Sequence, residues 1–220
     1  MQSEQRKSKY LSDKESCIWK EPAMEIYYLV NRWKTQGKTD FLDVGCGVGR
    51  HSYLFAKSGF RVRCLDICEE SVSIVNKRAE QENINIECSV GDFVTLPYED
   101  ESVDCILSYN VISHVDKVGM QQAIRESYRV LKNGGEWYLT LCSKKSWGYL
   151  QDWQQVDENT KLRMQEGAEY RVPHFFVDYT DIHELFAEFA VLSVKHVEEF
   201  REKNGKTISD FSYHVLVKKI

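Results

Sequence analysis

The sequence predicts an α/β fold in which a doubly wound, mostly parallel seven-stranded sheet has helices on both faces and ends in an antiparallel hairpin. Three observations predict it. Short apolar runs alternate with amphipathic stretches from residue 39 onward, a glycine-rich turn follows the first run, and two apolar segments separated by a turn end the chain. This alternation is typical of a parallel sheet with right-handed crossovers, covered on both faces.

The elements can be placed in order along the chain. Strands are expected at 41–44, 61–65, 84–90, 103–108 and 136–141, and the hairpin strands at 189–197 and 211–218, joined around Asn204-Gly205. Helices are expected around 26–33, from 53 to 59, around 72–79, from 120 to a stop at Gly134-Gly135, and over 181–189. Apolar side chains spaced at i, i+3, i+4 and i+7 predict the helical faces.

Composition narrows the classes of function. The formal net charge is −5 and the basic residues are scattered, so a nucleic-acid partner is unlikely. The seven cysteines form no C-x-x-C pair and no spacing typical of a metal site, so we expect reduced thiols and no metal. The polar N-terminus lacks a secretory signal and no apolar stretch could cross a membrane, which favours a cytoplasmic protein.

The strongest motif is FLDVGCGVGR at residues 41–50, a buried strand that runs into a glycine-rich turn and then a helix. In α/β sheets, nucleotide-like ligands bind outside the carboxyl ends of the strands, at such turns. Glycines suit this place because the backbone turns tightly and approaches the ligand without a Cβ. Asp43, at the end of the strand, is placed to accept a hydrogen bond from an amine or a water molecule.

Polar residues also follow the second and third strands. Asp66 comes 21 residues after Gly45, a distance at which a carboxylate can accept both ribose hydroxyls of an adenosine. Asp92 and Phe93 follow the third strand and could bind an adenine amino group and pack against the base. Each also has a structural interpretation, because Asp66 could cap a helix and Asp92 could stabilise a turn. Together they favour an adenosine-containing ligand.

Residues 41–141 resemble the core of class I methyltransferases that depend on S-adenosylmethionine (SAM). The resemblance is carried by LDVGCGVGR, LDICEESV, VGDFVTLPYEDESVDCILS and LKNGGEWYLTL. Trp19 to Pro22 and Gly49-Arg50 are similar to small-molecule members related to tellurite-resistance methyltransferases. The resemblance implies a methyl transfer from SAM to a small-molecule acceptor, with S-adenosylhomocysteine as the product.

The same resemblance implies which residues hold the cofactor. Three residues of the turn would approach SAM, an acid with its neighbour would bind the ribose and adenine, an acid–aromatic pair would hold the base, and two residues after strand four would line the methionine end. The turn residues are Gly45, Cys46 and Gly47, the acid with its neighbour is Asp66 with Ile67, and the acid–aromatic pair is Asp92 and Phe93. The two residues after strand four are Tyr109 and Asn110, and Asp43 and Arg50 are further contacts.

No catalytic residue is identified with certainty from the sequence. A phenol, alcohol or protonated amine acceptor would need a base, whereas a thiolate or carboxylate would not. His114 and His174 are the candidate bases by position. The segment 170–176 carries aromatic side chains that could clamp a planar acceptor or simply pack, and both interpretations stay open. The acceptor atom, the oligomeric state and the pathway are not predicted.

Under this interpretation the chain is one SAM-binding domain over residues 1–220. It comprises an N-terminal helical cap at 1–37, a cofactor-binding core at 38–142, a lid or substrate region at 143–180, and a terminal helix with a hairpin at 181–220. Two other functions remain. A protein that binds SAM without catalysis would share these motifs. A nicotinamide-dependent oxidoreductase is less compatible, because its G-x-G-x-x-G motif would need glycine at Arg50.

Overall fold

A computed structural model describes residues 21–167, 169–203 and 206–220 of the chain. The turn expected at Asn204-Gly205 lies outside the described residues, as do Trp19 and Lys20 of the segment Trp19 to Pro22. Within the part of the chain that the structure describes, no helix is both long enough and apolar enough to cross a bilayer.

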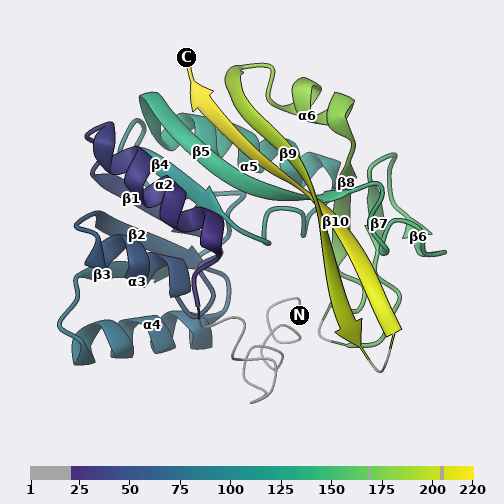
Figure 1. Cartoon of the computed structure of the whole chain (residues 1–220), viewed down its shortest axis with the longest axis horizontal. Helices are drawn as coiled ribbons and strands as arrows, with labels where there is room; N and C mark the ends of the chain where they lie inside the picture. Colours follow the sequence, from purple (N-terminus) through teal and green to yellow (C-terminus); the bar gives the residue numbers. More distant parts are fainter. Residues whose placement is uncertain (1–20, 168, 204–205) are drawn as a thin grey trace.

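The centre of the molecule is a twisted sheet (Figure 1). Five strands lie parallel in the order β3 (Ile86–Val90), β2 (Arg61–Asp66), β1 (Asp40–Val44), β4 (Val103–Ser108) and β5 (Leu131–Ser143). The hairpin continues the sheet: β10 (Lys206–Lys219) lies antiparallel to β5, and β9 (Phe189–Lys203) lies antiparallel to β10. These strands are the seven that the sequence predicts.

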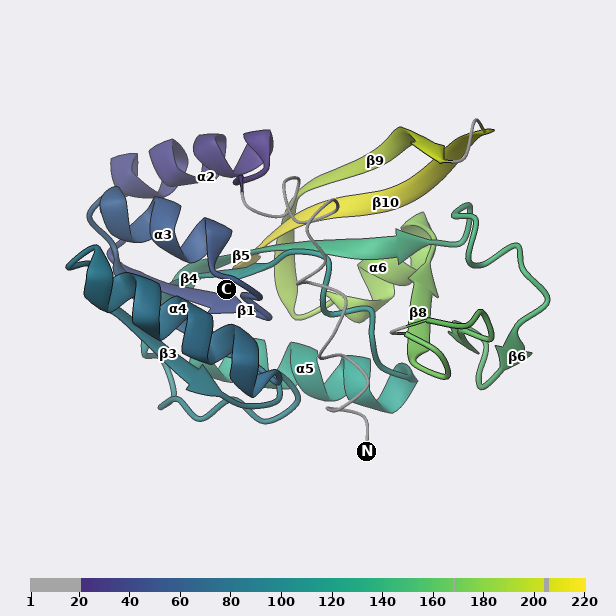
Figure 2. The same ribbon diagram turned by 90° about the horizontal axis from the view of Figure 1, so that it is seen from below.

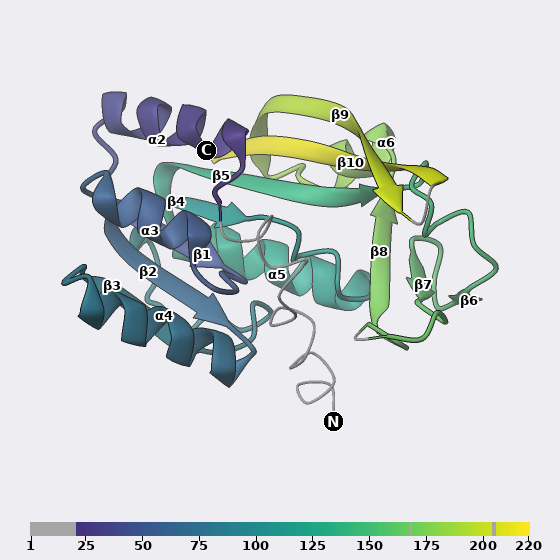
Figure 3. The ribbon, with the colours of Figure 1, turned by 60° about the horizontal axis from the view of Figure 1, so that its bottom comes forward.

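Over the described residues the sheet nevertheless has ten strands, so the predicted number of seven is wrong. The other three are β8 (Pro173–Val177), β7 (Thr160–Leu162) and β6 (Gln154–Gln155). β8 pairs with the last residues of β5, and β7 and β6 follow in antiparallel pairs, turned away from the main sheet (Figure 3). Strands this short show no clear alternation of apolar and polar residues, so the region 143–180 looked irregular in the sequence.

Helices cover both faces of the main sheet (Figure 2). One apolar core joins the sheet to α2 (Met24–Thr35), α3 (Arg50–Lys57) and α4 (Glu69–Gln81). The other core, on the opposite face, joins it to α5 (Lys117–Val130) and α6 (Tyr179–Leu185). Because a helix buries only one apolar stripe, its place in these cores explains the spacing of its apolar residues.

The boundary between α5 and β5 differs from the prediction. The helix ends at Val130, and Leu131 already has extended backbone angles, so the expected stop at Gly134-Gly135 is wrong. These glycines lie inside β5, where Gly134 has a φ of 76° and the pairing with β4 shifts its register. Leu131 is fully buried and fits the apolar face of the helix as well as the strand, so periodicity could not distinguish the two.

The last helix also begins earlier than predicted. α6 starts at Tyr179 because the Asp178 carboxylate accepts hydrogen bonds from the backbone N–H groups of Thr180 and Asp181. The Asp181 side chain in turn accepts from the Asp178 N–H at 2.7 Å. This reciprocal capping box fixes the start of the helix. The hairpin strands extend several residues beyond the predicted ends.

Helix α2 is held on the sheet by a buried carboxylate. Glu136 of β5 is 3% exposed and accepts hydrogen bonds from the Arg32 guanidinium at 2.8 and 2.9 Å and from the Trp33 indole at 2.8 Å. A buried charge requires such partners, because an unpaired one costs several kcal/mol. The contact fixes α2 beside the cavity described next.

Candidate functional site

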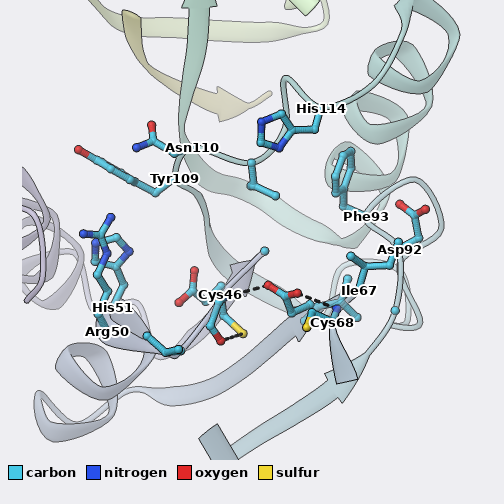
Figure 4. A pocket seen from close by; sticks show the side chains of 18 of the residues that line it. Cys46, Arg50, His51, Ile67, Cys68, Asp92, Phe93, Tyr109, Asn110 and His114 are labelled. Carbon is cyan, nitrogen blue, oxygen red and sulfur yellow. Dashed lines mark hydrogen bonds between the residues drawn. The ribbon is translucent and has the colours of Figure 1, made fainter. Parts of the chain in front are cut away.

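A cavity lies at the carboxyl ends of β1, β2, β3 and β4, among the loops that follow these strands (Figure 4). Its walls come from the glycine-rich turn, from the loops after β2 and β3, and from the loop after β4. Every residue for which the sequence predicts a cofactor contact lines this one cavity, namely Asp43, Gly45, Cys46, Gly47, Arg50, Asp66, Ile67, Asp92, Phe93, Tyr109 and Asn110. His114 lines it as well.

The glycine-rich turn has the backbone that its sequence predicts. Gly45 has a φ of 69°, and a Cβ built on it would lie 2.2 Å from a methyl carbon of Val111. The N–H groups of Gly45 and Cys46 both donate to the Leu65 carbonyl, at 2.7 and 3.0 Å. The turn is thus bound to the end of β2 and packed against Val111 of the loop after β4, and its residues line the cavity.

Asp66 joins two of the loops around the cavity. One carboxylate oxygen accepts from the Gly47 N–H at 2.8 Å, and the other accepts from the Cys68 N–H at 2.8 Å. The N-cap of α4 is Cys68, so Asp66 stabilises the approach to this helix without capping it. The position beside the glycine turn suits a carboxylate that accepts hydroxyl groups of a ligand.

Asp43 is buried beneath the turn. Its side chain is 2% exposed and accepts a hydrogen bond from the Ser52 hydroxyl at 2.6 Å. Burial raises the pKa of this carboxyl group from 3.8 to about 7, although the Ser52 hydrogen bond opposes the shift. A positive charge nearby would favour the ionised form of Asp43.

Asp92 and Phe93 lie on the opposite side of the cavity from Arg50 and His51 (Figure 4). The Asp92 carboxylate accepts from the Val94 N–H at 3.2 Å, so it also makes the turn contact that was the alternative interpretation of this residue. Phe93 is 9% exposed and packs in the core against α5. The pair can therefore offer one acceptor and one aromatic surface to a flat ring.

The loop after β4 is held in an uncommon conformation. Asn110 has a φ of 57°, and its N–H donates to the Thr140 hydroxyl at 2.7 Å while that hydroxyl donates back to the Asn110 side-chain oxygen at 3.0 Å. Backbone strain of this kind is common where a loop must present a group to a ligand. The Tyr109 hydroxyl donates to Glu25 of α2 at 2.7 Å. Burial, together with Glu25, raises the Tyr109 pKa well above its ordinary value of 10.

His114 lies where this cavity meets a second one. Tyr109 and Asn110 line the second cavity as well, and so does His174 of β8. The two imidazole rings are perpendicular, with centroids 4.9 Å apart. Most of the remaining wall of the second cavity comes from the region after β5 and from the hairpin, including Trp147, Trp153, Arg163, Phe176 and Phe211.

The sequence did not identify several residues of these cavities. Glu169 lines both of them, yet it follows no strand and belongs to no motif. His51 lies in the first turn of α3, accepts a hydrogen bond from the Ala23 N–H and packs against the Tyr109 ring. Burial lowers its pKa from 6.5 to about 3, so it is neutral at pH 7. Only the adjacency of His51 to the glycine motif could have drawn attention to it.

Distant side chains also come together into two sets with potential metal ligands, which the sequence did not predict. Cys46, Cys64 and Cys88 meet beneath the glycine turn, with the sulfur atoms of Cys46 and Cys88 separated by 3.8 Å. His114, Glu169 and His174 meet between the two cavities. Their separations in the sequence resemble no metal motif because the ligands come from different strands and loops.

Comparison with known proteins identifies the same core. A sequence model of the methyltransferase-domain family matches residues 42–139. The ubiquinone biosynthesis O-methyltransferase of Coxiella burnetii is 28% identical over 127 residues, which cover 58% of this chain and 53% of that protein. The chain thus spans about half the length of the curated relatives it matches.

Solved structures share the fold over almost the whole chain. A SAM-dependent methyltransferase from Methanosarcina mazei superimposes with a TM-score of 0.72 at 22% identity, covering 91% of this chain and 99% of that one. The 1,6-didemethyltoxoflavin-N1-methyltransferase of Burkholderia thailandensis, solved with S-adenosylhomocysteine, has a TM-score of 0.65 at 17% identity and covers 92% and 80%. Residues 42–139 thus match the methyltransferase-domain family, and the chain, with its glycine turn, its acids at successive strand ends and its antiparallel terminal hairpin, has the fold of these SAM-dependent methyltransferases.

Proposed function

We propose that this chain binds SAM in the first cavity and transfers its methyl group to a small-molecule acceptor in the second. The observation that carries the proposal is the convergence of residues from four strand ends on one cavity, which opens at His114 toward another. The match of residues 42–139 to the methyltransferase-domain family supports the reaction class.

The described contacts suggest how the cofactor would lie. Asp66, already oriented by two backbone N–H groups, would accept the ribose hydroxyls. Asp92 and Phe93 would receive the adenine on one side. Tyr109 and Asn110 would then face the methionine end, with Asp43 below it as a nearby negative charge. This orientation directs the sulfonium toward His114 and the second cavity.

The reaction needs little chemistry from the protein, because the sulfonium already activates the methyl group. The acceptor heteroatom forms a bond to the methyl carbon while the carbon–sulfur bond breaks, and its electron pair stays on the sulfur of S-adenosylhomocysteine. A proton on the acceptor is lost to a base or to water. The protein would contribute orientation and exclusion of water, which can lower a barrier by roughly 7–11 kcal/mol.

The second cavity suggests a planar acceptor. Trp147 and Trp153 pack edge to face at 5.8 Å, and His174 lies parallel to Phe176 at 6.3 Å, so flat surfaces form much of its wall. One relative is named as an O-methyltransferase of ubiquinone biosynthesis, and one structural neighbour was solved with 1,6-didemethyltoxoflavin bound. The net charge of −5 disfavours nucleic acid. The free cysteines of the described chain support a cytosolic location.

The proposal is tested by production of S-adenosylhomocysteine. Purified protein is incubated with SAM and a panel of phenols, catechols, heterocyclic amines and thiols, and the product is measured by mass spectrometry. We expect acceptor-dependent product formation by the wild type and at least a tenfold loss in Asp66→Asn, because the variant weakens cofactor binding. A protein that binds SAM but produces no S-adenosylhomocysteine with any acceptor would instead be a SAM-binding protein without catalysis.

A further inference from the structure

The junction between the two cavities holds a set of side chains that cofactor binding does not require. His114 comes from the loop after β4, Glu169 from the segment before β8, and His174 from β8 itself. Their nearest ligand atoms all lie within 4.8 Å of one another. We propose that His114, Glu169 and His174 bind a divalent transition-metal ion such as Zn²⁺ at the entrance of the acceptor cavity.

The donor set and its spacing suit such an ion. Two imidazole nitrogens and one carboxylate oxygen form a common protein site for zinc and related metals when a further coordination position stays open. Ligands at about 2.1 Å in tetrahedral geometry lie about 3.4 Å from one another. The Glu169 oxygen and the His174 Nε2 atom are 3.7 Å apart. Small side-chain movements would therefore bring the three atoms to one ion.

The imidazole of His174 is already oriented for coordination. Its ring is 7% exposed, and its Nδ1 atom lies 3.1 Å from the Val172 carbonyl oxygen, which can only accept a hydrogen bond. With its proton on Nδ1, the ring would offer the Nε2 lone pair to a metal ion placed between Nε2 and the Glu169 oxygen. A hydrogen bond from the distal nitrogen to a backbone carbonyl is the usual support of a metal-binding histidine. Trp153 and Phe176 both pack near the ring, with centroids 5.9 and 6.3 Å from its own.

Arg163 is the feature that could oppose a cation. Its guanidinium donates to the carboxylate of Glu169, so it competes for the negative charge but also fixes the direction of that carboxylate. Ligating carboxylates commonly accept such supporting hydrogen bonds. Glu199 and Asp210 line the same cavity and add negative charge to it. The balance of charge around the site is therefore compatible with a divalent ion.

The location gives the ion a use. His114 and Glu169 line both cavities and His174 lines the second, beside the point where the methyl group would emerge. A metal ion there can ligate an oxygen, nitrogen or sulfur of the acceptor and lower the pKa of that group. This role rests on the proposed function, and it predicts acceptors with a ligating heteroatom at the methylated position. The metal site itself does not depend on it.

The site is tested by titrating Co²⁺ into metal-free, untagged protein and recording the visible absorption spectrum, with Zn²⁺ as competitor. All proteins carry Cys88→Ser, because the cysteine cluster could bind the same ions. We expect one equivalent to bind, with an affinity reduced at least tenfold by His174→Gln and by Glu169→Gln. His183→Gln, an exposed histidine of α6, is the matched control and should bind as the parent does.

A titration of each protein with SAM separates this proposal from the cofactor assignment and reports whether the variants fold. Co²⁺ binding that is absent from the parent, or that is unchanged in both ligand variants, overturns the metal site whatever the SAM result. Loss of Co²⁺ binding in the variants while all of them still bind SAM supports it. If the parent binds Co²⁺ through these residues but does not bind SAM, the metal site stands and the proposed function fails.

Discussion

At the scale of the residue, Gly45 is the point where the cavity leaves no space for a side chain. Its φ of 69° disfavours any L-residue, and Val111 occupies the volume that a Cβ would need. Gly37, at the end of α2, has a similar φ of 71°, but a Cβ added to it would meet no other atom within 4 Å. The two glycines therefore separate backbone strain from steric overlap.

Substitution by alanine should distinguish these two costs. Gly37→Ala should lower the free energy of unfolding by about 1–2 kcal/mol, which is the cost of a left-handed alanine. Gly45→Ala should lower it by about 1–3 kcal/mol more, because the side chain overlaps Val111. Urea denaturation of both variants measures the difference. Equal losses would show that the loop after β4 moves away without cost, contrary to the close packing described.

Asp43 allows a second test at this scale. Its pKa of about 7 means that roughly half of the molecules are protonated at pH 7. If the positively charged end of SAM lies above Asp43, binding lowers this pKa and releases up to about half a proton. Calorimetric titrations at pH 7 should therefore give different enthalpies in phosphate and in Tris. Asp43→Asn should remove the part of the difference that Asp43 causes, and an unchanged difference would place the charge elsewhere.

The residues at strand ends were predictable because their function is tied to local sequence. Asp66 is the last residue of β2 and Asp92 lies two residues after β3, and parallel strands bring their carboxyl ends to one edge of the sheet. Glu169 and His174 were not predictable as a pair with His114. Their proximity depends on how the segment after β5 folds back, which has no periodic signal in the sequence.

At the scale of the element, the attachment of α2 to β5 depends on Glu136. Its carboxylate is buried, which would raise its pKa, but the hydrogen bonds from Arg32 and Trp33 outweigh burial and hold the pKa below its ordinary value of 4.5. A carboxylate with a lowered pKa in the folded state stabilises the fold at pH values above 4.5. That contribution is lost as the pH falls through the pKa of the folded state.

Removal of this carboxylate should therefore destabilise the protein in a pH-dependent way. At pH 7, Glu136→Ala should lower the free energy of unfolding by about 3–5 kcal/mol, because it leaves the Arg32 charge without its partner. Glu87→Ala, at an exposed ion pair on β3, should change it by less than about 1 kcal/mol. The difference between wild type and Glu136→Ala should narrow below pH 4.5. A difference that stays constant down to pH 3 would exclude this role.

Element positions were predictable where amphipathic patterns are long. α4 and the strands that carry the acids agree closely with the predicted ranges. The predicted end of α5 was wrong because Leu131 fits the apolar face of the helix and of the strand. α6 begins earlier than predicted because a capping box, and not the apolar pattern, sets its first residue. The strands β6 to β8 are stabilised by pairing with distant segments, which a local pattern does not contain.

At the scale of the whole molecule, two different parts of one sheet form the walls of the two cavities. The parallel strands β3, β2, β1 and β4 present the first cavity, and the region after β5 with the hairpin builds much of the second. The first part carries the family motifs and was predictable from them. The second part carries no motif that indicates its ligand, so the acceptor must be inferred from the structure.

The most direct test of the central claim is a calorimetric and thermal titration with SAM, S-adenosylhomocysteine and NADH on wild type and Asp66→Ala. At a hundredfold excess over Kd, a ligand stabilises the native state by about 2.7 kcal/mol. For a domain of this size that corresponds to a Tm increase of about 5–10 °C. If SAM binds beside Asp66, both adenosyl ligands should give this increase for the wild type, and Asp66→Ala should lose it. Binding of NADH without binding of SAM would contradict the central claim.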